Sequence, residues 1–415
     1  MSTIRPFVRA CIPIFAPAVL LAACGPALAQ QRTWTAPPPN LVERARDVLR
    51  EVPLIDGHND LPSRLLEEFG GSMTGAGDVS TPQPGGHTDL ARLREGLVGA
   101  QFWSAYVTTD SMGCCALRQA LREIDMVHRL VARYPEALEM AYTADDIERI
   151  HAAGRIASLI GVEGGHAIEN TLANLRVFQD LGVRYMTLTH SETLDWADAS
   201  TDASRHNGLT AFGEDVVREM NRVGIFVDIS HVAPATMHDA LRVTRAPVIF
   251  SHSSARGVTD HVRNVPDDVL RSLPENGGVV MVTFVPSFIS DDVARWSAAR
   301  DSVASAAGRA GLEAWEREHP VPRASVADVA DHIDHIREVA GIDHIGIGSD
   351  FDGISSVPIG LEDVSTFPVL FAELLRRGYS EQDLRKIAGL NVLRAMRAME
   401  GVAESMRREI DPLLN

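Results

Sequence analysis

Short apolar runs alternate with amphipathic helical stretches along most of the 415-residue chain, and this alternation constrains the fold more than any other feature. Eight runs have the length and composition of buried strands, at residues 53–56, 102–107, 157–162, 184–189, 226–229, 248–250, 278–283 and 345–348. Helical patterns lie between them, as expected for parallel strands joined by crossover helices, at residues 117–134, 171–181, 210–222, 233–243 and 326–340. Eight such units close a barrel. We therefore predict an α/β fold, a (β/α)8 TIM-like barrel with additional helices.

The composition narrows the chemistry that such a barrel can carry. With 45% hydrophobic and 23% charged residues, the chain resembles an ordinary soluble globular protein. Its formal net charge of −17 argues against a nucleic-acid partner, because a phosphate backbone requires a basic surface. Lys386 is the only lysine, which disfavours a Schiff base or a carboxylated lysine that bridges two metal ions. Any bridge between metal ions would come from a carboxylate.

The N-terminal residues 1–29 have the pattern of a bacterial export signal. Arg5 and Arg9 precede an apolar run, 10–23, that is too short to span a bilayer permanently. Cleavage before Cys24, in Leu-Ala-Ala-Cys, would leave a lipoprotein, whereas cleavage after Ala29 would leave an unanchored protein; we favour the first. We therefore expect an exported protein of the bacterial periplasm or envelope, with membrane contact only through a lipid anchor on Cys24.

The remaining boundaries follow from composition. Residues 30–45 contain three consecutive prolines and are predicted to be a tether, and residues 46–415 are predicted to form one barrel domain. Inside the barrel, residues 285–325 do not fit the alternation and are predicted to be a helical excursion over the barrel mouth. Cys114 and Cys115 are adjacent, so that a disulfide between them would be strained, and we expect two free thiols on a loop.

Residues that commonly bind metal ions follow most of the predicted strands, namely His58, Asp60, Glu163, His190, His231, His252 and Asp350. The carboxyl ends of the strands of a barrel meet at one face, so these side chains should converge there. Three imidazoles and two carboxylates, before His190 and Asp350 are added, exceed what one four-coordinate zinc ion needs. Two metal ions that share a carboxylate fit better, and Glu163 is the natural bridge. Asp228 is expected to orient its neighbours, and His166 to be a partner of the ligands or a core histidine.

These residues lie in seven short motifs whose order matches a known family, at residues 56–60, 163–166, 188–190, 228–231, 251–255, 263–267 and 348–353. From about residue 52 to the C-terminal helix, the chain resembles the membrane (renal) dipeptidase family, zinc-dependent peptidases of the amidohydrolase superfamily. The loop 191–195 departs from the mammalian members and leaves the side-chain preference open.

The resemblance implies two Zn²⁺ ions per chain and a role for each site residue. His58 and Asp60 would bind one ion, His231 and His252 the other, and Glu163 would bridge them. Asp350 and His190 would be catalytic, Asp350 by moving protons and His190 by contacting the substrate. Arg263 would bind the substrate's terminal carboxylate, for which a planar guanidinium is well suited.

The implied activity is hydrolysis of the amide bond of small dipeptides by a metal-bridging hydroxide. The resemblance extends this activity to dipeptides with a D-residue at the carboxyl end, and it implies a homodimer. Two alternatives stay open. One is a related metal-dependent amidohydrolase that acts on another amide, a lactone or an N-acyl amino acid, and the other is a binding protein that has lost catalysis. Zinc, manganese and cobalt all suit these ligands.

Overall fold

The structure of the protein is a computed structural model, and it describes residues 34–414. The export signal, both cleavage alternatives, Cys24 and the first residues of the tether lie outside the described residues. Among residues 34–414, none of the helices combines the length and the apolar character that crossing a membrane requires.

Eight parallel strands form a closed barrel in the order β2-β1-β9-β8-β7-β6-β5-β4, and pairing between β2 and β4 completes the ring. Their bounds are β1 Leu54–Asn59, β2 Val98–Tyr106, β4 Ile156–Glu163, β5 Val183–Thr187, β6 Phe226–Asp228, β7 Ile249–Phe250, β8 Val279–Val282 and β9 Ile345–Ile347. Each overlaps a predicted strand, and the predicted (β/α)8 fold is confirmed. The sequence did not reveal β3, Leu138–Met140, which pairs beside the first residues of β4.

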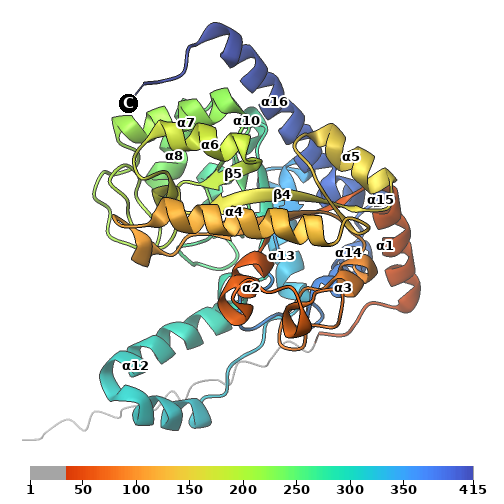
Figure 1. Cartoon of the computed structure of the whole chain (residues 1–415). Helices are drawn as coiled ribbons and strands as arrows, with labels where there is room; N and C mark the ends of the chain where they lie inside the picture. Colours follow the sequence, from red (N-terminus) through yellow and green to blue (C-terminus); the bar gives the residue numbers. More distant parts are fainter. Residues whose placement is uncertain (1–33, 415) are drawn as a thin grey trace, which may run out of the picture. The chain divides into compact units, whose positions relative to one another are not determined.

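The predicted crossover helices are also present (Figure 1), as α4 Ala116–Arg133, α6 Leu172–Asp180, α7 Ala211–Val223, α8 Pro234–Val243 and α13 Val326–Val339. Local sequence explains their ends. Ser325 and Asp328 form a capping box at the start of α13, and Gly224 ends α7 in the left-handed conformation. The other helices are α1 Pro39–Glu51, α2 Leu61–Phe69, α3 Leu90–Glu95, α5 Ala144–Ala152, α9 Asp267–Leu270, α10 Leu273–Asn276, α11 Pro286–Ile289, α12 Asp291–Glu318, α14 Phe367–Arg376, α15 Glu381–Arg385 and α16 Asn391–Glu409.

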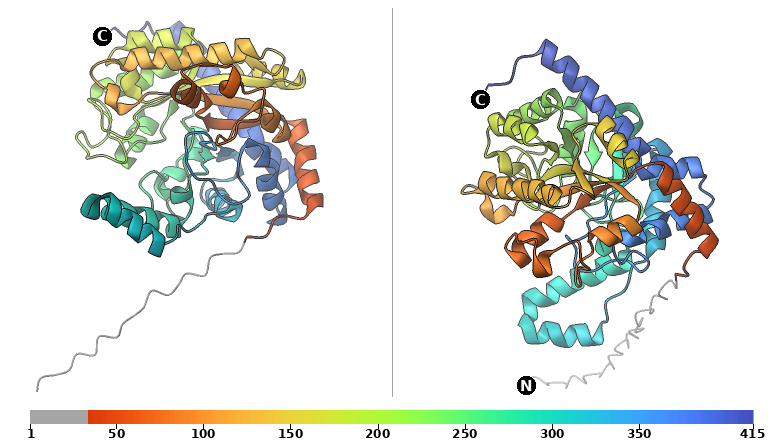
Figure 2. Two further views of the ribbon diagram at one scale, coloured as in Figure 1. Left: turned by 60° about the horizontal axis from the view of Figure 1, so that its bottom comes forward. Right: turned by 45° about the vertical axis from the view of Figure 1, so that its right-hand side comes forward.

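Two boundaries differ from the prediction. Helix α1 begins at Pro39, so residues 39–45, expected in the tether, are helical. Leu49 of this helix is fully buried, because α1 packs against α14. Segment 285–325 is helical as predicted, but α12 extends away from the helices around the barrel and only Val293 of its residues is buried (Figure 2). Gly308 breaks α12 with a left-handed residue and turns it back on itself.

The structure contradicts the expectation of two free thiols. Cys114 and Cys115 are joined by a disulfide in the turn before α4. The two Cα atoms are 3.8 Å apart, and the turn before α4 brings the two sulfur atoms together.

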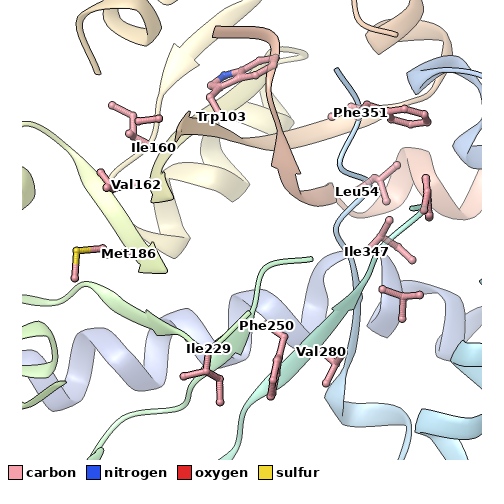
Figure 3. Packing of buried hydrophobic residues seen from close by; sticks show 14 of the residues in the cluster. Leu54, Trp103, Ile160, Val162, Met186, Ile229, Phe250, Val280, Ile347 and Phe351 are labelled. Atoms are coloured by element: carbon pink, nitrogen blue, oxygen red, sulfur yellow. The ribbon is translucent and has the colours of Figure 1, made fainter. Parts of the chain in front are cut away.

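Alternation along the strands divides the core into two layers. Leu54 of β1 packs outward between strands and helices, together with side chains such as Trp103, Phe250 and Ile347 (Figure 3). The next residue, Ile55, packs in the other cluster with residues of strands and of α5 and α16. This alternation follows from the two-residue period of a strand. The apolar alternation stops at the carboxyl ends of the strands, where polar side chains follow.

Candidate metal centre and active site

All eight residues predicted to form the site come together at the carboxyl ends of the strands. Glu163 is the last residue of β4, and His58 lies near the end of β1. A cavity of about 340 Å³ opens above them and is lined by Asp60, Glu163, His190, His231, His252, Arg263 and Asp350 among others. His58 is buried directly behind this wall, 3.2 Å from Asp60.

Glu163 stands at the centre of the ligand cluster, and its two carboxylate oxygens face different partners. Oε2 lies 3.4 Å from Nε2 of His58. Oε1 lies 3.0 Å from Nε2 of His231 and 3.4 Å from Nε2 of His252. A carboxylate that presents one oxygen to each of two ligand sets has the geometry of a bridge between two metal ions.

Three overlapping groups of side chains bring their donor atoms within 4.8 Å of one another: His58, Glu163 and His252; Glu163, His190 and His231; and His58, Asp60 and Asp350. These donors are imidazole nitrogens and carboxylate oxygens, which suit zinc and similar divalent ions. The residues present therefore fit a metal centre. His190 belongs to one of these groups, although its Nε2 is farther from Glu163 than that of His231, at 3.8 Å.

Two buried aspartates hold the strands that carry the predicted ligands. Asp228 accepts hydrogen bonds from the amide and hydroxyl of Ser251 at 2.9 and 2.7 Å, and the same hydroxyl lies 2.8 Å from Nδ1 of His252. Asp56 accepts from the amide and hydroxyl of Ser349, both at 2.7 Å. Each pair joins two strands just before a predicted ligand or catalytic residue, which restricts the orientation of the following side chain.

Close main-chain contacts set the spacing of three strand ends. A Cβ atom on Gly57 would lie 2.5 Å from the carbonyl oxygen of Ser251, and one on Gly348 would lie 1.8 Å from the same oxygen. Glycine is therefore required at both positions, immediately before His58 and Ser349.

Backbone conformation at the site is unusual. His231 and Asp350 both have positive φ, 68° and 66°, in the left-handed region that side chains with a Cβ atom rarely adopt. Such strain persists only where the surroundings hold it, and it is commonly found at functional sites.

Burial sets the charge state of the groups that line the cavity. It raises the pKa of Asp350 well above its ordinary value, and the nearby Asp60 carboxylate acts in the same direction. It lowers the pKa values of His231 and His252 well below the ordinary value, which favours the neutral imidazoles that bind metal ions. It also lowers the pKa of Arg263 to about 10, so the guanidinium stays charged at neutral pH.

Arg263 is almost fully buried and is prepared for an anionic partner. Its guanidinium lies over the ring of Phe288 at 5.3 Å, and Nη2 donates to the carbonyl of His252 at 3.4 Å. Nη1 is buried without a hydrogen-bond partner. A buried donor without a partner is costly, and a substrate carboxylate in the cavity would satisfy it.

Two tyrosines of the site were not predicted from the sequence, whereas His166 was expected to be a partner of the ligands or a core histidine. Tyr185 places its hydroxyl 2.8 Å from Nδ1 of His58. Tyr106 lines the cavity, with its ring centroid 4.9 Å from that of His190. His166 contacts the carbonyl of Thr108 at 3.2 Å. The strand pattern of the sequence placed Tyr106 and Tyr185 on barrel strands. It could not identify their contacts, because the residues that they contact lie far away in the sequence.

Comparison with known proteins places the chain in a family. The sequence profile of membrane dipeptidase (Peptidase family M19) matches residues 42–409. Over 372 residues the chain is 45% identical to Dipeptidase 3 of Rattus norvegicus and 43% identical to Dipeptidase 3 of Homo sapiens. Both matches cover 88% of this chain and 69% of the relative.

Solved structures share the fold. The probable dipeptidase PvdM from Pseudomonas aeruginosa superposes with a TM-score of 0.78 at 22% identity, over 88% of this chain and 100% of that one. A metallo peptidase from Rhodobacter sphaeroides, liganded with a phosphinate mimic of the dipeptide L-Ala-D-Ala, gives a TM-score of 0.68 at 27% identity, over 84% and 99% of the two chains. The chain therefore belongs to the membrane dipeptidase family, peptidase family M19, and is a metallopeptidase of that family.

Proposed function

We propose that the protein is a binuclear zinc dipeptidase that cleaves the single amide bond of dipeptides, including those with a D-residue at the carboxyl end. The observation that carries the proposal is the division of the Glu163 oxygens between His58 on one side and His231 and His252 on the other. His58 and Asp60 would hold one ion, His231 and His252 the second, and Glu163 would bridge them. Bound divalent ions supply Lewis acidity and activate water for attack on the amide.

The side chains around the centre take the remaining roles. Asp350 lies beside Asp60, and its raised pKa suits a carboxyl group that accepts a proton and delivers it to the leaving amine. Burial lowers the pKa of His190, so the neutral ring can donate a hydrogen bond to the substrate carbonyl oxygen as negative charge develops there.

Arg263 accounts for the selection of dipeptides. Its unpartnered Nη1 would bind the terminal carboxylate, while the amide bond lies against the ligand cluster in the same cavity. A longer peptide would place an amide rather than a carboxylate at Arg263. Acceptance of a carboxyl-terminal D-residue is supported by the phosphinate mimic of L-Ala-D-Ala bound to the related metallo peptidase from Rhodobacter sphaeroides.

The test combines metal content with a panel of L,L- and L,D-dipeptides. We expect two zinc ions per chain, and turnover that a chelator abolishes and zinc restores. Arg263→Lys should lower kcat/KM for dipeptides by roughly 30- to 1000-fold, the equivalent of about 2–4 kcal/mol. It should have little effect on dipeptide amides, which lack the carboxylate. Arg309→Lys, on the exposed part of α12, is the matched control.

Three outcomes would contradict the proposal. Turnover that survives removal of metal would exclude the metal centre. One ion per chain at full activity would exclude the bridge. Equal effects of Arg263→Lys on dipeptides and on their amides would exclude the carboxylate contact and would favour another amide, a lactone or an N-acyl amino acid as substrate.

We propose the cellular context from sequence alone. Export to the periplasm or envelope, with a lipid anchor on Cys24, is supported by the charges of Arg5 and Arg9, the apolar run that follows them and the residues before Cys24. The family resemblance supports a homodimer. Cys24→Ser should move the protein from the membrane fraction to the soluble fraction. Sedimentation of the purified protein should give twice the mass of one chain.

A further inference from the structure

The Cys114–Cys115 disulfide does not have the properties of a structural crosslink. A disulfide stabilises a fold chiefly by closing a loop in the unfolded chain, and the stabilisation grows with the length of that loop. Cys114 and Cys115 are consecutive, so their bond closes only the smallest possible ring and restricts little of the unfolded chain. They are also the only cysteines among the described residues. The bond therefore needs an explanation other than stability.

A second cavity, of about 230 Å³, lies beside this disulfide. Cys114 is exposed and lines it, together with His166, Glu169 and Asp195. His166 is buried, with 7% of its surface exposed, and its Nδ1 has no hydrogen-bond partner. Burial lowers the pKa of His166, so the ring is neutral at neutral pH. The two carboxylates thus give the cavity a negative charge.

The two sulfur atoms differ in their surroundings. Cys115 is the N-cap residue of α4 and is half-buried, whereas Cys114 is exposed in the preceding turn. The N-terminus of a helix stabilises a nearby negative charge. The first turn of α4 already binds one anionic group, because Glu169 accepts a hydrogen bond from the amide of Leu117 at 3.1 Å. A thiolate released at Cys115 is therefore favoured over one released at Cys114, and a more stable thiolate is the better leaving group.

We propose that Cys114–Cys115 is a thiol-exchange site that reacts with small thiols carrying an ammonium group. The external thiolate attacks Sγ of Cys114 and forms a mixed disulfide there. The Cys114–Cys115 bond breaks, and its electron pair leaves on Sγ of Cys115, which takes up a proton. A second external thiolate then attacks the external sulfur of the mixed disulfide and releases Cys114 as a thiolate. In total, two external thiols are oxidised to one disulfide, and the protein disulfide is reduced to two thiols.

Charge is what selects the thiol. Glu169 and Asp195 border the cavity from which Cys114 is reached, so a cationic reagent is attracted and an anionic one is repelled. The attraction should weaken as salt is added, because both carboxylates are exposed.

The experiment measures reduction of the disulfide in the native full-length protein by cysteamine, 2-mercaptoethanol and 2-mercaptoethanesulfonate. Samples are quenched by alkylation, and thiols are counted by mass spectrometry, which does not depend on enzymatic activity. Rates are divided by the thiolate fraction of each reagent and by the rates for the denatured protein. We expect cysteamine to react at least tenfold faster than the sulfonate. Asp195→Asn should reduce this ratio severalfold, whereas Asp301→Asn, on the exposed α12, should leave it unchanged.

Single-cysteine variants identify the sulfur that is attacked. With cystamine, the oxidised form of cysteamine, Cys115→Ser should form an adduct on Cys114 quickly, and Cys114→Ser should react at least tenfold more slowly at Cys115. Equal rates for the three thiols, faster reaction at Cys115, or two free thiols after exposure to oxidised reagent would each overturn the proposal.

Discussion

The hydroxyl of Tyr185 lies 2.8 Å from Nδ1 of His58, a contact between two residues that are 127 positions apart in the sequence. Both side chains are almost fully buried. If Nε2 of His58 binds a metal ion, as proposed, Nδ1 carries the hydrogen and donates a hydrogen bond to the tyrosine oxygen. In that arrangement Tyr185 would fix both the tautomer of His58 and the orientation of its ring.

Replacing Tyr185 with phenylalanine removes that acceptor and keeps the packed ring. We expect metal affinity to fall by about 10- to 100-fold, the usual effect of losing such a partner, with little change in secondary structure. Competition with a chelator, followed by elemental analysis, measures the affinity. Tyr142→Phe, at an exposed position, is the matched control. Equal affinities for the two variants would show that Tyr185 does not position His58.

Comparing Ser251→Ala with Ser349→Ala tests whether Ser251 positions the imidazole of His252 or only joins two strands. The variant loses a hydrogen bond to Asp228 and the contact with Nδ1 of His252. Ser349→Ala loses the equivalent hydrogen bond to Asp56 and a contact with the main-chain carbonyl of His58, but no contact with an imidazole ring. Both variants should lose about 1–2 kcal/mol in the free energy of unfolding, because each leaves a buried carboxylate short of a donor. Only Ser251→Ala should bind metal about tenfold more weakly; the same affinity in both would contradict the role given to Ser251.

Gly353→Ala tests how closely the loop after Asp350 packs on the ligand cluster. A Cβ atom there would lie 2.3 Å from Oδ2 of Asp60 and 2.6 Å from Oδ1 of Asp350. We expect kcat/KM to fall by at least 100-fold, because both carboxylates must move. Gly401→Ala, in α16 with no atom near the added Cβ, should retain full activity and gain about 0.5–1 kcal/mol of stability. Activity near the native value in Gly353→Ala would show that the loop can move aside.

Glu123 predicts a pH dependence of stability. Burial raises its pKa from 4.5 to about 8, with a hydrogen bond from Ser63 acting in the opposite direction. Between these two values the unfolded chain has released a proton that the folded chain still holds, so this group makes the fold less stable as the pH rises from 4.5 to about 8.

Glu123→Gln removes the titration. At pH 8 the variant should be more stable than the native chain, by on the order of 2–4 kcal/mol, and the difference should fade towards pH 4.5. Thermal or urea unfolding across this range measures the difference, with Glu313→Gln on the exposed α12 as control. A difference that does not change with pH would show that Glu123 is ionised in the folded protein.

The barrel and the convergence of the proposed ligand residues were predictable because their signals are local. Apolar runs marked the strands, and residues such as His231 and His252 lie just beyond them. The fold then brings all strand ends to one face without further information. The supporting contacts were not predictable in this way. The Tyr185–His58 contact depends on register across the barrel, and on Gly161, where a Cβ atom would lie 1.9 Å from the tyrosine ring.

The wrong predictions have a common physical cause. Tertiary contacts outweighed weak local patterns in the sequence. The proline-rich residues before position 46 suggested a tether, but packing on α14 extends α1 back to Pro39. The three residues of β3 are too few for a periodic signal, and they are held by β4. The segment 285–325 was expected over the barrel mouth, yet Phe288 of α11 is its only residue that lines the cavity within the described chain.

At Gly57 and Gly348 two strands pack so closely on the carbonyl oxygen of Ser251 and on the Met281 side chain that no Cβ atom fits, and these contacts fix the gaps between the strand ends. Evolution can therefore revise the cavity wall and the loops around it, and with them the choice of substrate, while the scaffold for the ligands keeps its dimensions. Substitutions in the cavity wall would then change which substrate fits without changing the spacing of the proposed metal ligands.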